Sequence, residues 1–175
     1  MSGLEQMYQQ VILDHARERH GEGLGRVAAE PGSEGVGESF QVNPTCGDEV
    51  TLRLRLVDAP DAAAGGSPVI AELGWEGVGC SISRASLSVM NDLVAGRSVR
   101  EADRVAEDFR ALMNNRGAEL GDERDERLED AIVFAGTAKF PARIKCALLG
   151  WMALRDATAK ALVTGPDTTS SQEER

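Results

Sequence analysis

The chain has 175 residues, of which 42% are hydrophobic and 27% are charged, a composition typical of one folded globular domain. Its formal net charge of −10 at pH 7 disfavours binding to the phosphates of nucleic acids. The sequence shows no signal-peptide pattern and no run of about 18 apolar residues, so we expect a cytoplasmic protein that does not span a membrane.

An amphipathic helix is predicted at the N-terminus, because apolar residues recur there at spacings of three and four. They form one stripe of about four turns: Leu4, Met7, Tyr8, Val11, Ile12 and His15. Residues 20–37 follow, are rich in glycine and contain Pro31, and they predict a long irregular connection.

The next segment predicts a small β-sheet. Residues 38–42 form a short candidate strand, and residues 51–57 alternate apolar and polar side chains, which is typical of a strand with one buried face. The flexible loop 60–67 leads into a return strand at residues 69–75. Together they predict an antiparallel sheet of three strands.

Helical patterns fill the second half of the chain. Apolar residues 82–94 are spaced as in a helix that Gly96 closes. Ser98, with Glu101 three residues later, forms a capping box and predicts a helix that runs to about Met113.

Charged residues and a proline indicate the remaining elements of the chain. The charged run 121–127 predicts a solvated segment before a short helix at 128–134, and Pro141 suits the first turn of a final helix. The polar residues 164–175 predict a disordered tail. We therefore expect an α+β fold with a single domain at residues 1–163.

Three cysteines lie in unusual surroundings. Cys46 occurs in Asn-Pro-Thr-Cys-Gly-Asp, Cys80 follows Gly-Val-Gly at a predicted helix start, and Cys146 lies near the start of the last helix. An odd number of cysteines in a reducing compartment favours metal or redox chemistry over disulfides. Gly47 lets the chain turn, so that Asp48 can face the same ion as Cys46. Three thiols and one carboxylate provide the four ligands of a closed zinc site.

Other interpretations of these residues stay open. A single cysteine is more commonly an inert buried side chain, and wide spacing distinguishes these three from paired Cys-x-x-Cys motifs. His15 and His20 are further candidate ligands, although we expect His15 to be a packed core residue and His20 to lie at the surface. Arg143 lies three residues before Cys146, and shares its helix face, so its guanidinium could stabilise a thiolate or contact a partner.

These motifs together resemble the SufU branch of the IscU-like family of iron–sulfur assembly proteins, related to the NifU N-terminal domain. The matching segments are Tyr8–His15, Asn43–Asp48, Gly77–Ser83 and Phe140–Trp151. Scaffold members usually have a histidine where Lys145 stands and a Leu-Pro-Pro-Val-Lys motif that is missing here. The additional segment at residues 97–121 also resembles the SufU branch.

The resemblance implies a three-stranded antiparallel sheet with helices packed on one face. It also implies a zinc-dependent sulfurtransferase whose Zn²⁺ ligands are Cys46, Asp48, Cys80 and Cys146. A SufS-type cysteine desulfurase containing pyridoxal phosphate would deliver persulfide sulfur to Cys46, once a partner histidine had replaced this thiol on zinc. Arg143 would serve partner docking or guide the freed thiol, and the sulfur would pass to a downstream Suf cluster-assembly scaffold.

Two alternatives to sulfur transfer stay open. An iron–sulfur scaffold of the IscU type would carry iron at the same ligands and would be brown, whereas a zinc protein would be colourless. A structural zinc module that mediates binding would depend on Cys46 for folding but not for sulfur transfer.

Overall fold

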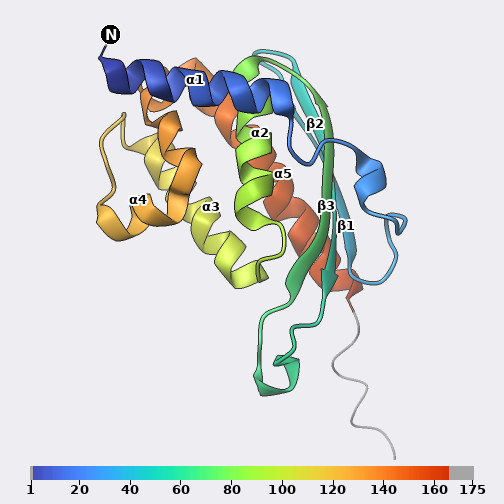
Figure 1. The fold of residues 1–175 in the computed structure, drawn as a ribbon. Coiled ribbons are helices and arrows are strands. Elements are labelled where there is room, and N and C mark those ends of the chain that lie inside the picture. The colour runs from blue at the N-terminus through green and yellow to red at the C-terminus, as the bar shows by residue number, and fades with distance from the viewer. Residues whose placement is uncertain (1, 166–175) are drawn as a thin grey trace, which may run out of the picture.

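An antiparallel sheet of three strands organises the computed structural model, which describes residues 2–165 (Figure 1). The strands are β1 (Val36–Asn43), β2 (Asp48–Val57) and β3 (Val69–Val78), and they lie side by side in sequence order. β1 and β2 begin earlier than the sequence pattern suggested, because Val36 and Asp48 still have partners in the ladder. The predicted three-stranded sheet is confirmed.

The alternating pattern of β2 separates its two faces. Val50, Leu52 and Leu54 are fully buried beneath the helices. Arg53 and Arg55 point the other way and form ion pairs of 2.8 Å with Glu38 and 2.7 Å with Glu72 on the neighbouring strands. Cross-strand charge pairs of this kind reinforce the register that the buried face sets.

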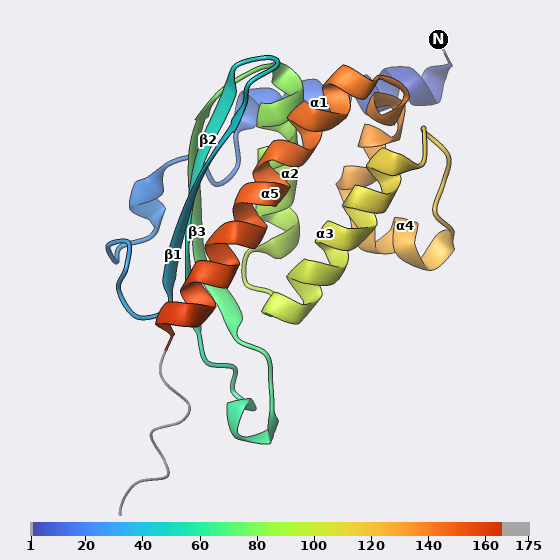
Figure 2. The same cartoon turned by 180° about the vertical axis from the view of Figure 1, so that it is seen from behind.

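One face of the sheet carries the long helices. α5 (Pro141–Thr164) runs diagonally across β1 and β2, as the view from behind shows (Figure 2). α2 (Ser81–Val94) packs beside α5, and α1 (Gly3–Glu18) crosses over α2. On the opposite face the short 3₁₀ helix η1 (Leu24–Arg26) contacts β3 and β2. The α+β class, with helices packed on one face, is confirmed.

The predicted stripe of α1 is buried only toward its C-terminal end. Ile12 and His15 pack against the core, but the side chains of Leu4 and Met7 are each 55% exposed. Ser2 and Glu5 form a capping box that begins this helix. The exposed half therefore leaves apolar surface available beside the start of α5.

The additional helical segment begins as expected. Ser98 caps α3 (Val99–Asn114), where its hydroxyl accepts the Glu101 N–H at 3.2 Å and the Glu101 carboxylate accepts the Ser98 N–H at 3.0 Å. The sequence-based prediction of this capping box is confirmed. A short 3₁₀ helix, η2 (Ala62–Ala64), lies in the loop between β2 and β3.

The charged segment 121–127 contains no buried residue, in agreement with the predicted solvated segment, but its helical structure was not predicted. A helix, α4 (Asp122–Leu128), occupies these residues, and the 3₁₀ helix η3 (Glu129–Lys139) follows it where a short helix at 128–134 was expected. Arg124 and Arg127 of α4 both bind Asp108, a carboxylate of α3 that is only 4% exposed. A buried carboxylate needs such partners, so the charged run is fixed onto α3.

Pro141 lies in the first turn of α5, as predicted. Thr164 is the last residue of this helix, and its hydroxyl bonds to the Val36 carbonyl at 3.2 Å. The tail predicted at 164–175 therefore begins too early, because Thr164 is helical. Residues 166–175 of that prediction lie outside the described residues. Within residues 2–165 no helix combines the length and hydrophobicity needed to cross a bilayer.

Replacing the N-cap of α3 tests the local account of the additional segment. We expect Ser98→Ala to lower the free energy of unfolding by about 1 kcal/mol, because it removes the acceptor for the Glu101 N–H, whereas Ser98→Gly should cost only a few tenths. Urea denaturation of both variants measures the difference. Equal stability of Ser98→Ala and the wild type would contradict the capping role.

Candidate metal centre

Three separate elements bring the cysteines to one end of the molecule. Cys46 lies in the turn between β1 and β2, Cys80 is the N-cap of α2, and Cys146 lies in the second turn of α5. Asp48 is the first residue of β2. The β1–β2 turn and the N-terminal parts of α2 and α5 gather at the same end of the sheet in both views (Figures 1 and 2).

The turn that carries Cys46 is closed by short-range hydrogen bonds. The Gly47 N–H donates to the Asn43 carbonyl at 2.8 Å, and the Asn43 side-chain oxygen accepts the Thr45 N–H at 3.1 Å. Gly47 has a φ of +76°, a conformation that glycine adopts without strain. This turn leaves Cys46 at the surface and directs Asp48 inward, where it is 4% exposed.

Gly79 allows the Asp48 carboxylate to reach the start of α2. A Cβ atom at this position would overlap the Ser83 hydroxyl and lie 3.0 Å from the Asp48 carboxylate. In its absence, Asp48 Oδ1 accepts the Cys80 N–H at 3.2 Å. A free N–H at a helix N-terminus favours negative charge, so this contact places the carboxylate where the helix stabilises it.

Three of the four predicted ligand side chains form one group, and the fourth, Cys80, contacts that group through Asp48. Cys46 Sγ lies 3.4 Å from Cys146 Sγ, and Cys80 Sγ lies 3.4 Å from Asp48 Oδ2. The ligand atoms of Cys46, Asp48 and Cys146 all lie within 4.8 Å of one another. Ligand atoms around a tetrahedral zinc ion are separated by about 3.5–3.8 Å, given its usual bond lengths. The spacing of these three ligand atoms is therefore compatible with zinc, whereas Cys80 Sγ lies outside their group although it contacts Asp48.

The charges of this centre also favour a cation. Burial raises the pKa of Asp48, but hydrogen bonds from the Cys146, Cys46 and Cys80 thiols outweigh it and leave that pKa below its ordinary value. Burial, the contacts with Cys46 and Asp48, and the nearby negative charges raise the pKa of Cys146 far above its ordinary value. Cys146 is therefore held as a neutral thiol beside the ionised Asp48, and a divalent ion bound there would let the thiols lose their protons.

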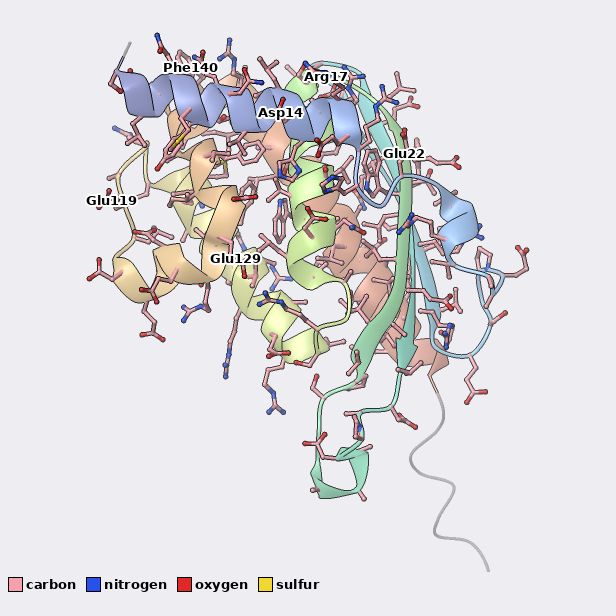
Figure 3. The ribbon with its side chains drawn as sticks, in the orientation of Figure 1. Asp14, Arg17, Glu22, Glu119, Glu129 and Phe140 are labelled. Carbon is pink, nitrogen blue, oxygen red and sulfur yellow. The ribbon has the colours of Figure 1, made fainter. Side chains whose placement is uncertain are left out.

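Arg143 lies beside this centre rather than in it. Its guanidinium stacks over the Phe140 ring, with 4.7 Å between Cζ and the ring centroid. Both residues line a mostly apolar groove of about 740 Å³ that also includes Cys80 and the α1 residues Tyr8 and Ile12. Figure 3 shows Phe140 alongside the N-terminal half of α1. Arg143 therefore shares this groove with Cys80, and its predicted role stays a prediction.

Two polar residues near the thiols were not singled out from the sequence. Asn43 is buried, and its Nδ2 lies 4.0 Å from Cys146 Sγ. Ser83 Oγ lies 3.9 Å from Cys80 Sγ and donates to the Cys80 carbonyl at 3.0 Å. The Asn-Pro dipeptide before Cys46 is a turn signal that could have identified Asn43. Nothing local identifies Ser83 beyond its place three residues into α2.

The histidines take no part in this cluster of thiols. His15 is 7% exposed and contacts Ser88 Oγ through Nδ1 at 2.8 Å, which confirms the prediction of a packed, hydrogen-bonded residue. The His20 side chain is 38% exposed, in agreement with the expected surface position. They lie together with Asp92 in a separate group.

A family match and two similar proteins place the chain in one family. Residues 7–159 match the NifU-like N-terminal domain. The chain is 34% identical over 162 residues to the zinc-dependent sulfurtransferase SufU of Bacillus subtilis strain 168, covering 91% of this chain and 94% of that protein. It is 35% identical over 162 residues to the iron–sulfur cluster assembly scaffold protein IscU of Streptococcus pyogenes serotype M1, covering 92% and 88%.

A solved structure shares the fold. It is a candidate iron–sulfur cluster assembly scaffold protein for the SUF system from Fervidobacterium islandicum AW-1, with a TM-score of 0.63 and 28% identity. The alignment covers 88% of this chain and 98% of that one. The similarity therefore extends over the sheet and the helices that position the thiols.

Removal of the carboxylate tests the four-ligand arrangement. We expect Asp48→Asn to weaken zinc binding by at least about 100-fold, because loss of even a supporting contact around a metal costs about 10–100-fold. Competition with a chelator of known affinity measures this change. Glu49→Gln, an exposed neighbour on β2, is the control and should bind zinc as the wild type does. Unchanged affinity in Asp48→Asn would exclude Asp48 as a ligand.

Proposed function

The chain belongs to the NifU-like N-terminal domain family, and within that family we propose that it is a zinc-dependent sulfurtransferase of iron–sulfur cluster assembly. A role in cluster assembly is supported by the names of both relatives. The more specific activity is supported by the Bacillus subtilis relative, named a zinc-dependent sulfurtransferase. The observation that carries the proposal is an exposed thiol, Cys46, beside a buried thiol and a buried carboxylate.

Zinc would be held by Cys46, Asp48, Cys80 and Cys146, and when bound it would keep the thiols deprotonated without redox chemistry of its own. Cys46 is the thiol best placed to react. It lies at the surface on a short turn, whereas Cys146 is 6% exposed in a helix. Cys80 is also exposed, but its backbone N–H and its sulfur both contact Asp48.

We propose that the Cys46 thiolate attacks the outer sulfur of a persulfide on the partner enzyme. The sulfur–sulfur bond of that persulfide breaks, and the partner cysteine leaves as a thiolate with the electron pair. The outer sulfur, with its proton, becomes a persulfide on Cys46. This is the general chemistry of thiol–disulfide exchange, so it needs no additional oxidant or reductant. The earlier expectation that a partner histidine first replaces Cys46 on zinc stays a prediction.

A cysteine desulfurase of the SufS type, which contains pyridoxal phosphate, is the partner that this reaction requires. The apolar groove beside Cys80 is a suitable docking surface, since it is continuous with the exposed apolar side chains of α1. Arg143 lies at this groove, where its fixed guanidinium could contact the partner or guide the approach of Cys46. A downstream Suf cluster-assembly scaffold would then receive the sulfur from Cys46.

A second candidate function is that of an iron–sulfur scaffold. It is favoured by the Streptococcus pyogenes relative, which is named a scaffold protein at nearly the same identity. A lysine, Lys145, precedes the third cysteine, and its side chain is exposed rather than directed into the centre. Zinc and sulfur transfer therefore remain our preferred proposal.

The acceptor role of Cys46 can be tested by serine replacement. We expect Cys46→Ser to abolish transfer of sulfur from a SufS-type desulfurase, because the hydroxyl is a poor nucleophile for sulfur at neutral pH. Mass spectrometry of the chain after one turnover detects the added sulfur atom. Thr45→Ser on the same turn is the matched control. Full persulfide formation on Cys46→Ser would assign the acceptor role to another cysteine.

The role of Arg143 can be separated from that of the zinc ligands. Arg143→Ala should reduce stimulation of the desulfurase by at least about tenfold, since loss of one charged interfacial contact costs about 2 kcal/mol or more. Zinc content should remain unchanged. The control, Arg110→Ala, removes an exposed arginine of α3, away from the groove. Loss of zinc in Arg143→Ala would make Arg143 part of the metal centre instead.

A further inference from the structure

Both histidines of the chain lie together at the end of α1. His15 belongs to the last turn of this helix and His20 to the loop that follows, and their rings meet edge to face with 5.2 Å between centroids. A nitrogen of each ring and a carboxylate oxygen of Asp92 lie within 4.8 Å of one another. Asp92 lies on α2, twelve residues after Cys80 and so about 18 Å along the helix, which separates this group from the thiols.

The backbone around His20 holds its ring in place. The His20 N–H donates to Ser88 Oγ at 3.0 Å, and its carbonyl accepts the indole N–H of Trp75 at 2.8 Å. Ser88 Oγ also contacts His15 Nδ1 at 2.8 Å, so one hydroxyl of α2 links the two histidines. The next residue, Gly21, is packed so closely on Asn91 that a Cβ atom would overlap its side chain. These contacts therefore hold both imidazole rings in position before any metal binds.

Three carboxylates surround the two rings. His20 Nδ1 lies 2.6 Å from Asp92 Oδ2, and His20 Nε2 lies 2.9 Å from Glu18 Oε2. His15 Nε2 lies 3.6 Å from Asp130 Oδ2. Among the ion pairs of residues 2–165, none joins these three carboxylates to a lysine or an arginine. Within the described residues, the ion-pair contacts of these three carboxylates are therefore made with the two imidazoles.

The carboxylates around His20 favour a cation at this place. The His20 ring lies between two carboxylates, those of Asp92 on the Nδ1 side and Glu18 on the Nε2 side. An environment that attracts a proton to an imidazole between carboxylates also attracts a metal cation, which competes for the same lone pair.

We propose that His15, His20 and Asp92 form a second metal site, selective for a divalent transition ion such as Zn²⁺. Two imidazole nitrogens and one carboxylate oxygen are ligands that zinc accepts, whereas Ca²⁺ and Mg²⁺ prefer oxygen alone. If His20 binds through the nitrogen that faces Asp92, its other N–H donates to Glu18. That is the carboxylate–histidine–metal arrangement that orients metal-binding imidazoles in proteins.

Metal bound there would tie the loop after α1 to α2. At present the proton shared between His20 and Asp92 makes this connection, and a metal ion would replace it. The ion would join three points of the fold, namely the end of α1, the loop and α2. It is distinct from the thiol centre in both ligands and location.

The test is the zinc stoichiometry of the folded full-length chain. Equilibrium dialysis against buffered micromolar zinc, followed by elemental analysis, should give two zinc ions per chain for the wild type. His20→Asn and Asp92→Asn should each give one, and the control Asp103→Asn should still give two, because Asp103 is an exposed carboxylate of α3 outside the histidine group. Circular dichroism verifies that each variant is folded. One zinc in the wild type that both variants retain would overturn the second site.

The outcomes also separate this proposal from the proposed function. One zinc that is lost in His20→Asn and retained in Cys146→Ser would support the histidine site and contradict the thiol centre. Because the chain has two histidines, their imidazole signals in nuclear magnetic resonance spectra provide a measurement without variants. Both should change on addition of the second equivalent of zinc. Unchanged histidine signals at saturating zinc would overturn the proposal.

Discussion

The packing of α5 across β1 and β2 is the constraint on which the thiol centre depends. This contact brings Cys146 to within 3.4 Å of Cys46, one hundred residues earlier in the chain. The β1–β2 register then directs Asp48 under the same helices, and α2 adds Cys80 at its N-terminus. Since the three thiols come from three elements, metal bound there would also fasten the sheet to both helices.

The centre combines a buried half with an exposed half. Asp48 and Cys146 are removed from water, and the negative charge of Asp48 favours a cation there, whereas Cys46 and Cys80 face the surface. A partner can thus reach a thiol without opening the core. α2 connects this centre with the histidine cluster, because Cys80 caps one end of the helix and Asp92 lies near the other.

Short-range chemistry in the sequence predicted much of the fold. The capping box at Ser98, the proline at the start of α5 and the alternation along β2 all depend on neighbours within a few residues. Cysteine context and resemblance also indicated four ligands, of which the structure groups Cys46, Asp48 and Cys146 and places Cys80 in contact with Asp48. The helix α4 was missed because its arginines are fixed by Asp108 on α3, a contact that no local pattern encodes. The grouping of His20 with Asp92, 72 residues apart, was missed for the same reason.

The most direct test of the central claim is the metal content of the protein purified without added metal, with zinc, iron and acid-labile sulfide measured per chain. The account predicts a colourless protein that contains zinc, at least one ion per chain, and no iron or sulfide. A brown protein that contains iron with sulfide in place of zinc would contradict it and would favour the scaffold function.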